Sequence, residues 1–339
     1  MSGEDFAVIV AGAGLVGLAL APALARSGLK VALVDRAPVT APEFDLDTWD
    51  ARIFAISPGS ATFLRSLGAW QMLAPARIEP IEAMHVAGDA GATIEFSAYE
   101  LGERALAWIV EERALRAALL PLVFESGVEV IGGAAFASLE WTADAGMLTL
   151  AETGGPARVL SAKLIVGADG VRSWVRQAAG LTAEPRPYGQ TAVVANFACE
   201  RAHHGVARQW FRADGGVLAW LPLPGNRISI VWSAKDVQAK HLLELPTQEF
   251  AEIVADAGSN VLGRLTCITA PAAFPLHRLR AGRTVGMRVA LVGDAAHVVH
   301  PTGRPGYQPR LCRLSNTECD AVWPQREHGC RGPDAITAL

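Results

Sequence analysis

Apolar and polar positions in the first 35 residues predict a strand, a helix and a second strand. Residues 6–11 form a short β-rich run, and residues 30–35 form a second buried run. Between them, residues 15–27 are rich in Ala and Leu and end before Gly28, a usual helix terminator. Strand, helix and strand within about 30 residues predict a βαβ unit with a parallel pair of strands.

The rest of the chain mixes helical stretches with short strands. Residues 37–50 are rich in Pro, Asp and Thr and should form a loop. The predicted helices are 58–67, with Ser57 as N-cap and Gly68 as stop, then 111–126 and 247–257. The predicted strand regions are 83–96 (a hairpin), 128–164, most of 191–232, and 288–292.

This order predicts an α/β fold in which a Rossmann-like domain contains an inserted β-sheet domain. The Rossmann-like domain should comprise residues 1–82, 111–185 and 278–301. The inserted β-rich substrate domain should comprise residues 83–110 and 186–277. Residues 302–339 show no helical apolar period, and we expect them to form a disordered tail.

Composition narrows the class of protein. A net charge of -4 and a pI near 6.1 provide no basic surface for nucleic acid. The five cysteines have no framework spacing, which indicates a reducing compartment such as the cytoplasm. The uncharged run 6–25 is long enough to span a bilayer, but its glycines, its proline and its acidic flank favour the βαβ interpretation.

A glycine-rich turn follows the first strand. Gly12, Gly14 and Gly17 match G-x-G-x-x-G between a strand and a helix. The first glycine allows a tight turn, the second lets the backbone approach a pyrophosphate, and the third permits close helix–strand packing. Asp35 ends the second strand, where a carboxylate can accept a hydrogen bond from a ribose hydroxyl. The motif does not distinguish FAD from NAD.

Two further apolar strands end in turns that carry an aspartate. Residues 164–173 contain Asp169 and Gly170, and residues 289–297 contain Gly293 and Asp294. Each turn should open onto a helix, so either aspartate alone could be an ordinary helix cap. Together and in this order, the three motifs resemble the fingerprints of FAD-dependent aromatic hydroxylases.

A narrower resemblance is to the 2-polyprenylphenol hydroxylases of ubiquinone biosynthesis. It covers residues 6–301 and is carried by Asp-Ala-Arg-Ile-Phe-Ala-Ile-Ser at 50–57, Ser60, Leu-Gly-Ala-Trp at 67–70, Trp-Ile-Val-Glu-Glu-Arg at 108–113 and Phe-Pro-Leu at 274–276. The resemblance implies a GR2-type FAD-binding domain. Glu112 stands where the family has an amide side chain, so we assign it no role.

The resemblance also implies which residues lie at the cofactor. The predicted cofactor-binding residues are Gly12, Gly14, Gly17, Asp35, Arg36, Arg52, Asp169, Gly170, Gly293 and Asp294. The second motif should serve both FAD and the nicotinamide cofactor. Arg52 and Pro301 should lie near the flavin, although Arg52 could instead form a surface ion pair with Asp50. No residue is assigned as catalytic, and no metal site is predicted.

The implied reaction is hydroxylation of an electron-rich, polyprenylphenol-type ring through a flavin hydroperoxide, with NAD(P)H as reductant and O2 as co-substrate. A prenylated substrate implies peripheral contact with the inner membrane, and association with other ubiquinone-biosynthesis enzymes is a further expectation. Three tryptophans of the β-rich middle, Trp210, Trp220 and Trp232, either line an apolar substrate cavity or belong to the sheet core. The ring position, the choice of NADH or NADPH, and the oligomeric state stay open.

Three rival functions are consistent with the residues. The chain could be another flavoprotein oxidoreductase, such as a halogenase or prenyl reductase. It could be a nicotinamide-only dehydrogenase. It could also be a non-catalytic, truncated product of a frameshifted gene that lacks the C-terminal helical part of the fold.

The frameshift hypothesis rests on the sequence after Pro301. The family continues there with Leu-Ala-Gly-Gln-Gly, an apolar residue and Asn-Leu-Gly, whereas this chain has Thr-Gly-Arg-Pro-Gly-Tyr-Gln-Pro-Arg-Leu at 302–311. With suitable synonymous codons, a one-base shift turns these ten residues into Leu-Ala-Gly-Gln-Gly-Ile-Asn-Leu-Gly-Phe. Out-of-frame sequence also explains Cys312, Cys319, His328 and Cys330 better than a zinc site does.

We therefore predict that the DNA across codons 300–312 restores the family motif after a one-base shift. Sequencing that region checks the prediction. A gene in which neither alternative frame encodes the motif would contradict it.

Overall fold

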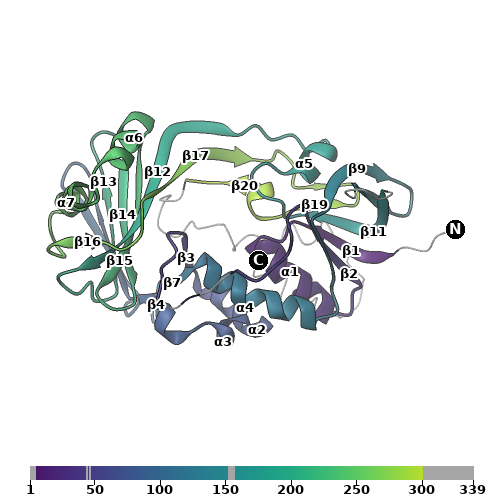
Figure 1. Cartoon of the computed structure of the whole chain (residues 1–339), viewed down its shortest axis with the longest axis horizontal. Helices are drawn as coiled ribbons and strands as arrows, with labels where there is room; N and C mark the ends of the chain where they lie inside the picture. The colour runs from purple at the N-terminus through teal and green to yellow at the C-terminus, as the bar shows by residue number, and fades with distance from the viewer. Residues whose placement is uncertain (1–4, 43–44, 46, 152–156, 301–339) are drawn as a thin grey trace.

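The predicted βαβ unit is present and lies within the eight-stranded sheet. The computed structural model describes residues 5–300 except 43–44, 46 and 152–156 (Figure 1). Strand β1 (Phe6–Ala11) leads through the glycine turn into helix α1 (Leu15–Arg26), and strand β2 (Val31–Asp35) pairs with β1 in parallel. The alternative of a membrane span is not supported, because no helix of the described residues is long and apolar enough to cross a bilayer.

An eight-stranded sheet is built around β1. Its main path is β18-β19-β11-β1-β2-β8, and β9 and β10 extend it from β11. The added strands are β8 (Glu129–Gly132), β9 (Ala135–Trp141), β10 (Gly146–Ala151), β11 (Arg158–Gly167), β18 (Val285–Gly286) and β19 (Val289–Leu291). Helices α1, α2 (Pro58–Leu67) and α4 (Glu112–Glu125) bury their apolar faces on one side of the parallel strands. Strands β9 and β10 contribute to the apolar core on the other side.

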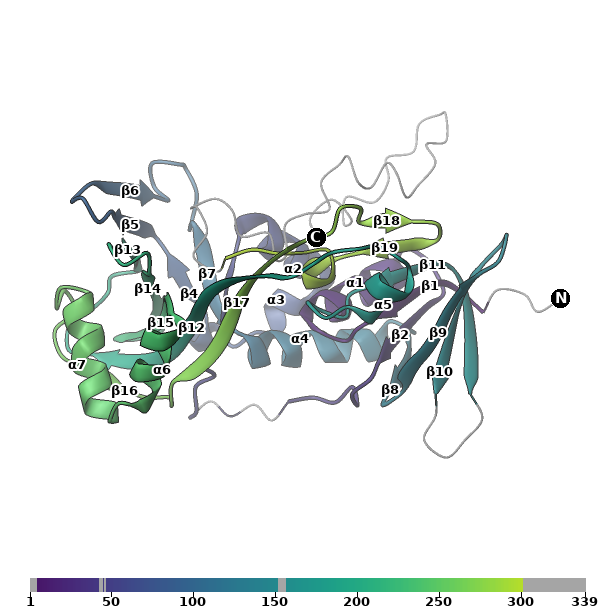
Figure 2. The same cartoon turned by 90° about the horizontal axis from the view of Figure 1, so that it is seen from above.

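A nine-stranded sheet forms the other half of the molecule. Its main path is β20-β17-β12-β15-β14-β13-β5-β6, with β16 on β12. The strands are β5 (Ala83–Ala87), β6 (Thr93–Ser97), β12 (Arg186–Cys199), β13 (Val206–Phe211), β14 (Val217–Leu223), β15 (Arg227–Lys235), β16 (Leu265–Cys267), β17 (Ala272–Arg280) and β20 (His297–Val298). Strands β12 and β17 pair with each other and run side by side between the two halves (Figures 1 and 2).

Each face of the nine-stranded sheet is covered by different elements. Helices α6 (Asp236–Glu244) and α7 (Thr247–Ala257) cover one face, where Trp220, Trp232 and Phe250 are buried together. The core interpretation of these tryptophans is therefore confirmed, and Trp210 packs against the same cluster. A small sheet of β3 (Ile53–Ile56), β7 (Ala107–Glu111) and β4 (Glu79–Ile81) packs on the opposite face.

Local sequence signals placed most elements within one or two residues. Ser57 caps α2 by accepting a hydrogen bond from the Ser60 N–H, and Gly68 ends the helix in the left-handed conformation. The helix α6 was not predicted. The helix expected after the third motif is wrong, because a 3₁₀ turn (Gly293–Ala295) leads into β20, which pairs with β17. The predictions for Pro301 and the tail lie outside the described residues.

Replacing Phe250 by Ala should destabilise the sheet half strongly. The ring is 1% exposed and packs on Phe197 at 5.7 Å between centroids. We expect the free energy of unfolding to fall by about 3–5 kcal/mol, because a buried aromatic ring leaves a cavity. Urea denaturation measures this, with Val237→Ala on the exposed side of α6 as a control that should change stability by less than about 0.5 kcal/mol. Equal effects of the two variants would contradict the core assignment.

Candidate cofactor site

Strand register brings the three glycine–acid turns to one edge of the parallel sheet. Ala11, Gly167 and Leu291 end β1, β11 and β19, and they are cross-strand partners. The Ala168 N–H donates to the Ala11 carbonyl at 2.7 Å, and the Val292 N–H donates to the Gly167 carbonyl at 2.9 Å. The chain leaves β1 toward β2 on one side, while β11 lies on the other, so this edge is a topological switch point, where ligands bind in such folds.

The three glycines of the first turn have different surroundings. Gly12 has φ +113°, and a Cβ there would lie 2.4 Å from the Ala168 carbonyl oxygen. A Cβ on Gly17 would lie 1.8 Å from the Gly12 carbonyl oxygen, so helix α1 packs directly on the turn. A Cβ on Gly14 would meet nothing within 4 Å. The first and third glycines are therefore required by the fold itself, whereas Gly14 borders open space at the start of α1.

Asp35 lies beside the same turn. Its Oδ2 accepts a hydrogen bond from the Ala13 N–H at 2.6 Å, and its Oδ1 accepts one from the Ala37 N–H at 2.8 Å. These bonds hold the carboxylate at the glycine turn, and each oxygen retains a lone pair that can accept from a sugar hydroxyl. Arg36 follows with an exposed side chain.

The second turn is held by hydrogen bonds at the start of a helix. Asp169 Oδ2 accepts hydrogen bonds from the Trp174 and Val175 N–H groups, at 2.7 and 3.0 Å, at the start of α5 (Trp174–Ala178), whose N-cap is Ser173. Its Oδ1 is buried and has no hydrogen-bond partner among the described residues. Gly170 adopts φ +81° in the same turn. Asp169 thus satisfies N–H groups at the helix start without being the N-cap residue, and it keeps one buried acceptor.

The third turn packs against the first and is tied to the second. A Cβ on Gly293, which has φ +58°, would lie 3.0 Å from the Val16 side chain. Asp294 follows it, half-buried in the 3₁₀ turn. The buried Arg176 donates to the Ala295 carbonyl at 2.9 Å, which links the second motif to the third. Burial lowers the pKa of Arg176, and Asp169 opposes that effect.

Arg52, which the sequence placed near the flavin, has an ion-pair partner that the sequence did not indicate. Its guanidinium forms an ion pair with Glu112 at 2.6 Å, so the alternative of an ion pair with Asp50 is wrong. Asp50 instead accepts the Arg52 backbone N–H at 2.9 Å. Burial raises the pKa of Glu112, and Arg52 opposes that rise.

Arg116 was not among the predicted residues. Its Nη1 donates to the Ala13 carbonyl at 2.7 Å, which places a cation beside the glycine turn. No local pattern indicated this contact, because Ala13 lies 103 positions away in the chain.

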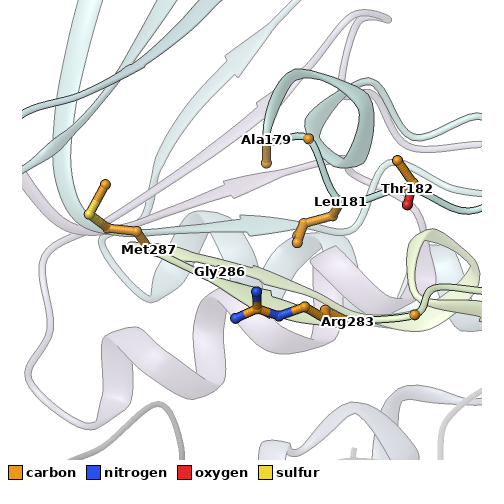
Figure 3. Close-up of a pocket in the computed structure, with 8 residues that line it drawn as sticks. Ala179, Leu181, Thr182, Arg283, Gly286 and Met287 are labelled. Atoms are coloured by element: carbon orange, nitrogen blue, oxygen red, sulfur yellow. The ribbon is translucent and has the colours of Figure 1, made fainter.

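Two hollows of the described surface lie away from these turns. One of about 450 Å³ lies beside α5 and β18 and is lined by residues such as Leu181, Arg283 and Met287 (Figure 3). Another of about 470 Å³ is lined by Trp49, Arg227 and neighbours. Neither contains a predicted cofactor residue. Within the described part of the chain, no three His, Cys, Asp or Glu residues lie together as metal ligands.

The geometry fits a dinucleotide. Open space at Gly14 and the N–H groups of α1 suit phosphate, and the Arg116 cation lies nearby. Asp35 suits a sugar hydroxyl, and the buried Asp169 Oδ1 is an acceptor without a partner in the described residues.

Comparison with known proteins agrees with this geometry. The family described as FAD binding domain matches residues 5–307. "Ubiquinone hydroxylase UbiL" of Rhodospirillum rubrum is 34% identical over 302 residues, which is 88% of this chain and 68% of that protein. "3-demethoxyubiquinol 3-hydroxylase" of Escherichia coli is 33% identical, covering 90% of this chain and 77% of that protein.

Solved structures share the fold. PqsL of Pseudomonas aeruginosa in complex with 2-aminobenzoylacetate superposes with a TM-score of 0.71 at 22% identity, covering 87% of this chain and 80% of that chain. Aklavinone-11 hydroxylase with FAD and aklavinone superposes with a TM-score of 0.67 at 22% identity, covering 89% and 59%.

Substitutions of Gly14 and Gly17 should separate cofactor binding from folding. Gly14→Ala has room for its Cβ, so the free energy of unfolding should change by less than about 0.5 kcal/mol. It should nevertheless weaken FAD binding by about tenfold or more, because the methyl group occupies the space of the pyrophosphate. Gly17→Ala should lose stability and cofactor together, because its Cβ collides with backbone. Thermal unfolding and titration with FAD check both; undiminished FAD affinity in Gly14→Ala would contradict the site.

Proposed function

Because the chain belongs to the FAD binding domain family and is an FAD-dependent monooxygenase by that relationship, we propose that it hydroxylates a polyprenylphenol-type ring in ubiquinone biosynthesis. The proposed reductant is NAD(P)H, and the proposed co-substrate is O2. The names of the relatives at 30–34% identity, in bacteria and animals, support the pathway and the reaction class. The family match argues against a nicotinamide-only dehydrogenase.

The observation that carries the proposal is the alignment of the three turns at one sheet edge. In the proposed complex the α1 N-terminus binds the pyrophosphate, Asp35 accepts from the ribose, and Asp169 and Asp294 accept from other polar groups of FAD. Gly170, Gly293, Arg36 and Arg52 are proposed to lie along the cofactor. Bound FAD supplies the activation of O2, which amino-acid side chains cannot perform.

The proposed division into domains follows from this site. Residues 1–82, 111–185 and 278–301 would hold FAD, and residues 83–110 and 186–277 would hold the substrate. The long strands β12 and β17 connect the two halves, and the proposal places the substrate on the sheet half, next to the cofactor edge.

We place the substrate ring against the face of the nine-stranded sheet opposite α6 and α7. Small apolar residues are cross-strand neighbours there, with Val194 opposite Val231 and Val231 opposite Ala219. Short side chains leave volume for a ring, and the apolar surface excludes water from the reacting centre. A prenyl tail would extend beyond the protein, and peripheral contact of a cytoplasmic protein with the inner membrane belongs to this proposal.

Purified protein should carry, or take up, a yellow chromophore with the visible spectrum of oxidised FAD. Anaerobic NAD(P)H should bleach it, faster with a polyprenylphenol analogue present, and labelled O2 should place one oxygen atom in the ring. A product halogenated in the presence of halide and O2 would support the halogenase alternative, and a product with a saturated prenyl double bond would support the prenyl reductase alternative. Protein that stays colourless with excess FAD would support the non-catalytic alternative.

A further inference from the structure

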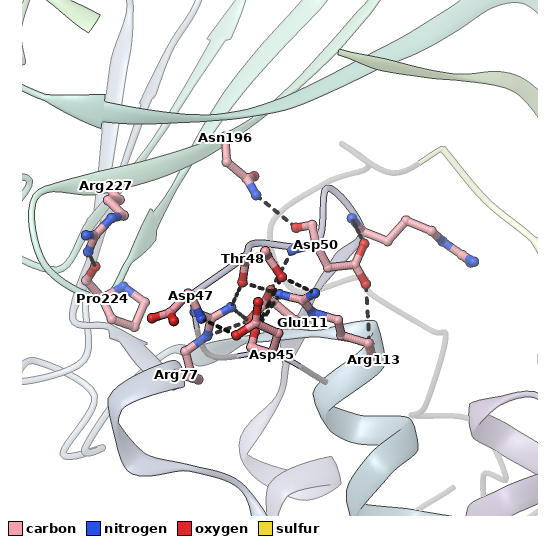
Figure 4. A network of polar contacts seen from close by, with 11 residues as sticks. Asp45, Asp47, Thr48, Asp50, Arg77, Glu111, Arg113, Asn196, Pro224 and Arg227 are labelled. Carbon is pink, nitrogen blue, oxygen red and sulfur yellow. Dashed lines mark hydrogen bonds and ion pairs between the residues drawn. The ribbon is translucent and has the colours of Figure 1, made fainter. Parts of the chain in front are cut away.

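Asp50 joins three separate parts of the chain through all its polar groups. Its N–H donates to Glu111 Oε1 at 2.6 Å. Its carboxylate accepts the Arg52 N–H at 2.9 Å and the Arg113 N–H, in the first turn of α4, at 3.3 Å. Its carbonyl accepts Asn196 Nδ2, from β12 of the nine-stranded sheet, at 2.8 Å (Figure 4). The conformation of Asp50 is therefore set jointly by α4 and by the sheet.

The α4 side of this junction is rigid. Glu111 is 1% exposed and forms an ion pair with Arg77, which is 5% exposed, at 2.6 Å. Arg77 also donates to the Thr48 carbonyl at 2.6 Å, and Arg113 contacts the same carbonyl. Breaking a buried pair of this kind is strongly unfavourable, so residues 48–50 are firmly held to α4.

The sheet side of the junction is a single side chain. Asn196 is fully buried, its backbone N–H donates to Thr269 Oγ1 at 2.9 Å, and its backbone carbonyl accepts the Ile268 N–H at 2.8 Å. Its side-chain Oδ1 is buried and has no hydrogen-bond partner among the described residues. Leaving such an acceptor unpaired costs about 1–3 kcal/mol, which a ligand donor would recover.

Asn196 belongs to the sheet face on which the substrate is proposed to lie. It is two residues from Val194 on β12, on the same face, and its cross-strand partner on β15 is Ser229. Arg52, two residues beyond Asp50, is half exposed, with its guanidinium 5.9 Å from the Phe274 ring centre on β17. One amide thus connects the substrate face to the backbone that carries Arg52.

We propose that Asn196 accepts the phenol hydroxyl of the substrate at Oδ1 and, through its Nδ2 bond to Asp50, positions Arg52. The identity of the substrate in this inference rests on the proposed function. The link from Asn196 through Asp50 to Arg52 does not depend on that function. Because one planar amide would make both bonds, substrate binding at Oδ1 is linked to the position of the Arg52 backbone through Asp50. Affinities for substrate and FAD are therefore coupled.

Asn196→Ala tests the link without any cofactor. In the cofactor-free chain, amide hydrogen exchange at residues 50–53 should accelerate by about tenfold, while exchange in α7 stays unchanged. The control is Ser233→Ala. Ser233 is as buried as Asn196, and its hydroxyl also has no hydrogen-bond partner in the described chain. It lies on the same strand as Ser229, the cross-strand partner of Asn196, four residues further along. Asn196→Ser, whose hydroxyl is too short to reach Asp50, should behave as Asn196→Ala and serves if the alanine variant does not fold. Equal exchange at 50–53 in the wild type and Asn196 variants would overturn the positioning role.

Binding to the FAD-loaded protein tests the substrate contact. Equilibrium dialysis should show a polyprenylphenol analogue binding about tenfold tighter than its O-methyl ether, because the ether cannot donate to Oδ1. Asn196→Ala should abolish that preference and weaken FAD binding by roughly tenfold, whereas Ser233→Ala should preserve both. A phenol preference retained in Asn196→Ala would overturn the contact. Protein that binds neither FAD nor phenol would instead refute the proposed function. The hydrogen-exchange measurement would still decide whether Asn196 positions the backbone at Arg52.

Discussion

The structure depends on the register of three parallel strands. Because Ala11, Gly167 and Leu291 are level across the sheet, the turns that follow them must lie side by side. The first turn cannot carry a side chain at Gly12 or Gly17, since backbone fills that space. A shift of one residue in any of these strands would move the turn that follows it away from the common edge and reverse the faces of its side chains. Strand pairing, more than any single side chain, assembles the cofactor site.

A second constraint joins the two halves of the molecule. The buried pair of Arg77 and Glu111 holds the loop before β3 against helix α4, and Asn196 reaches the same loop from the sheet. Buried charges are costly unless every donor and acceptor is used, which favours one defined arrangement of the loop. Arg52 follows this loop directly, and its N–H donates to the Asp50 carboxylate. Its environment is therefore a property of the interface between the halves.

Local chemistry allowed most of the fold to be predicted. Ser57 and Gly68 mark the ends of α2, and the glycine turn separates β1 from α1, because caps and turns depend on residues that are neighbours in the chain. The short 3₁₀ turn at Gly293–Ala295 could not be predicted this way, since β20 forms by pairing with a strand from another part of the sequence. Helix α6 was missed within a long strand-rich region.

The sequence alone determined the class of fold, the three turns and the family, because glycine spacing and apolar runs act over a few residues. Only the tertiary structure decided the partners of the charged groups. Arg52 pairs with Glu112, 60 positions away, and Arg116 reaches Ala13, 103 positions away. Asp50, in the loop before β3, accepts a hydrogen bond from Asn196 on the nine-stranded sheet. Long side chains find their partners through packing, and no local pattern encodes distances between residues so far apart in the chain.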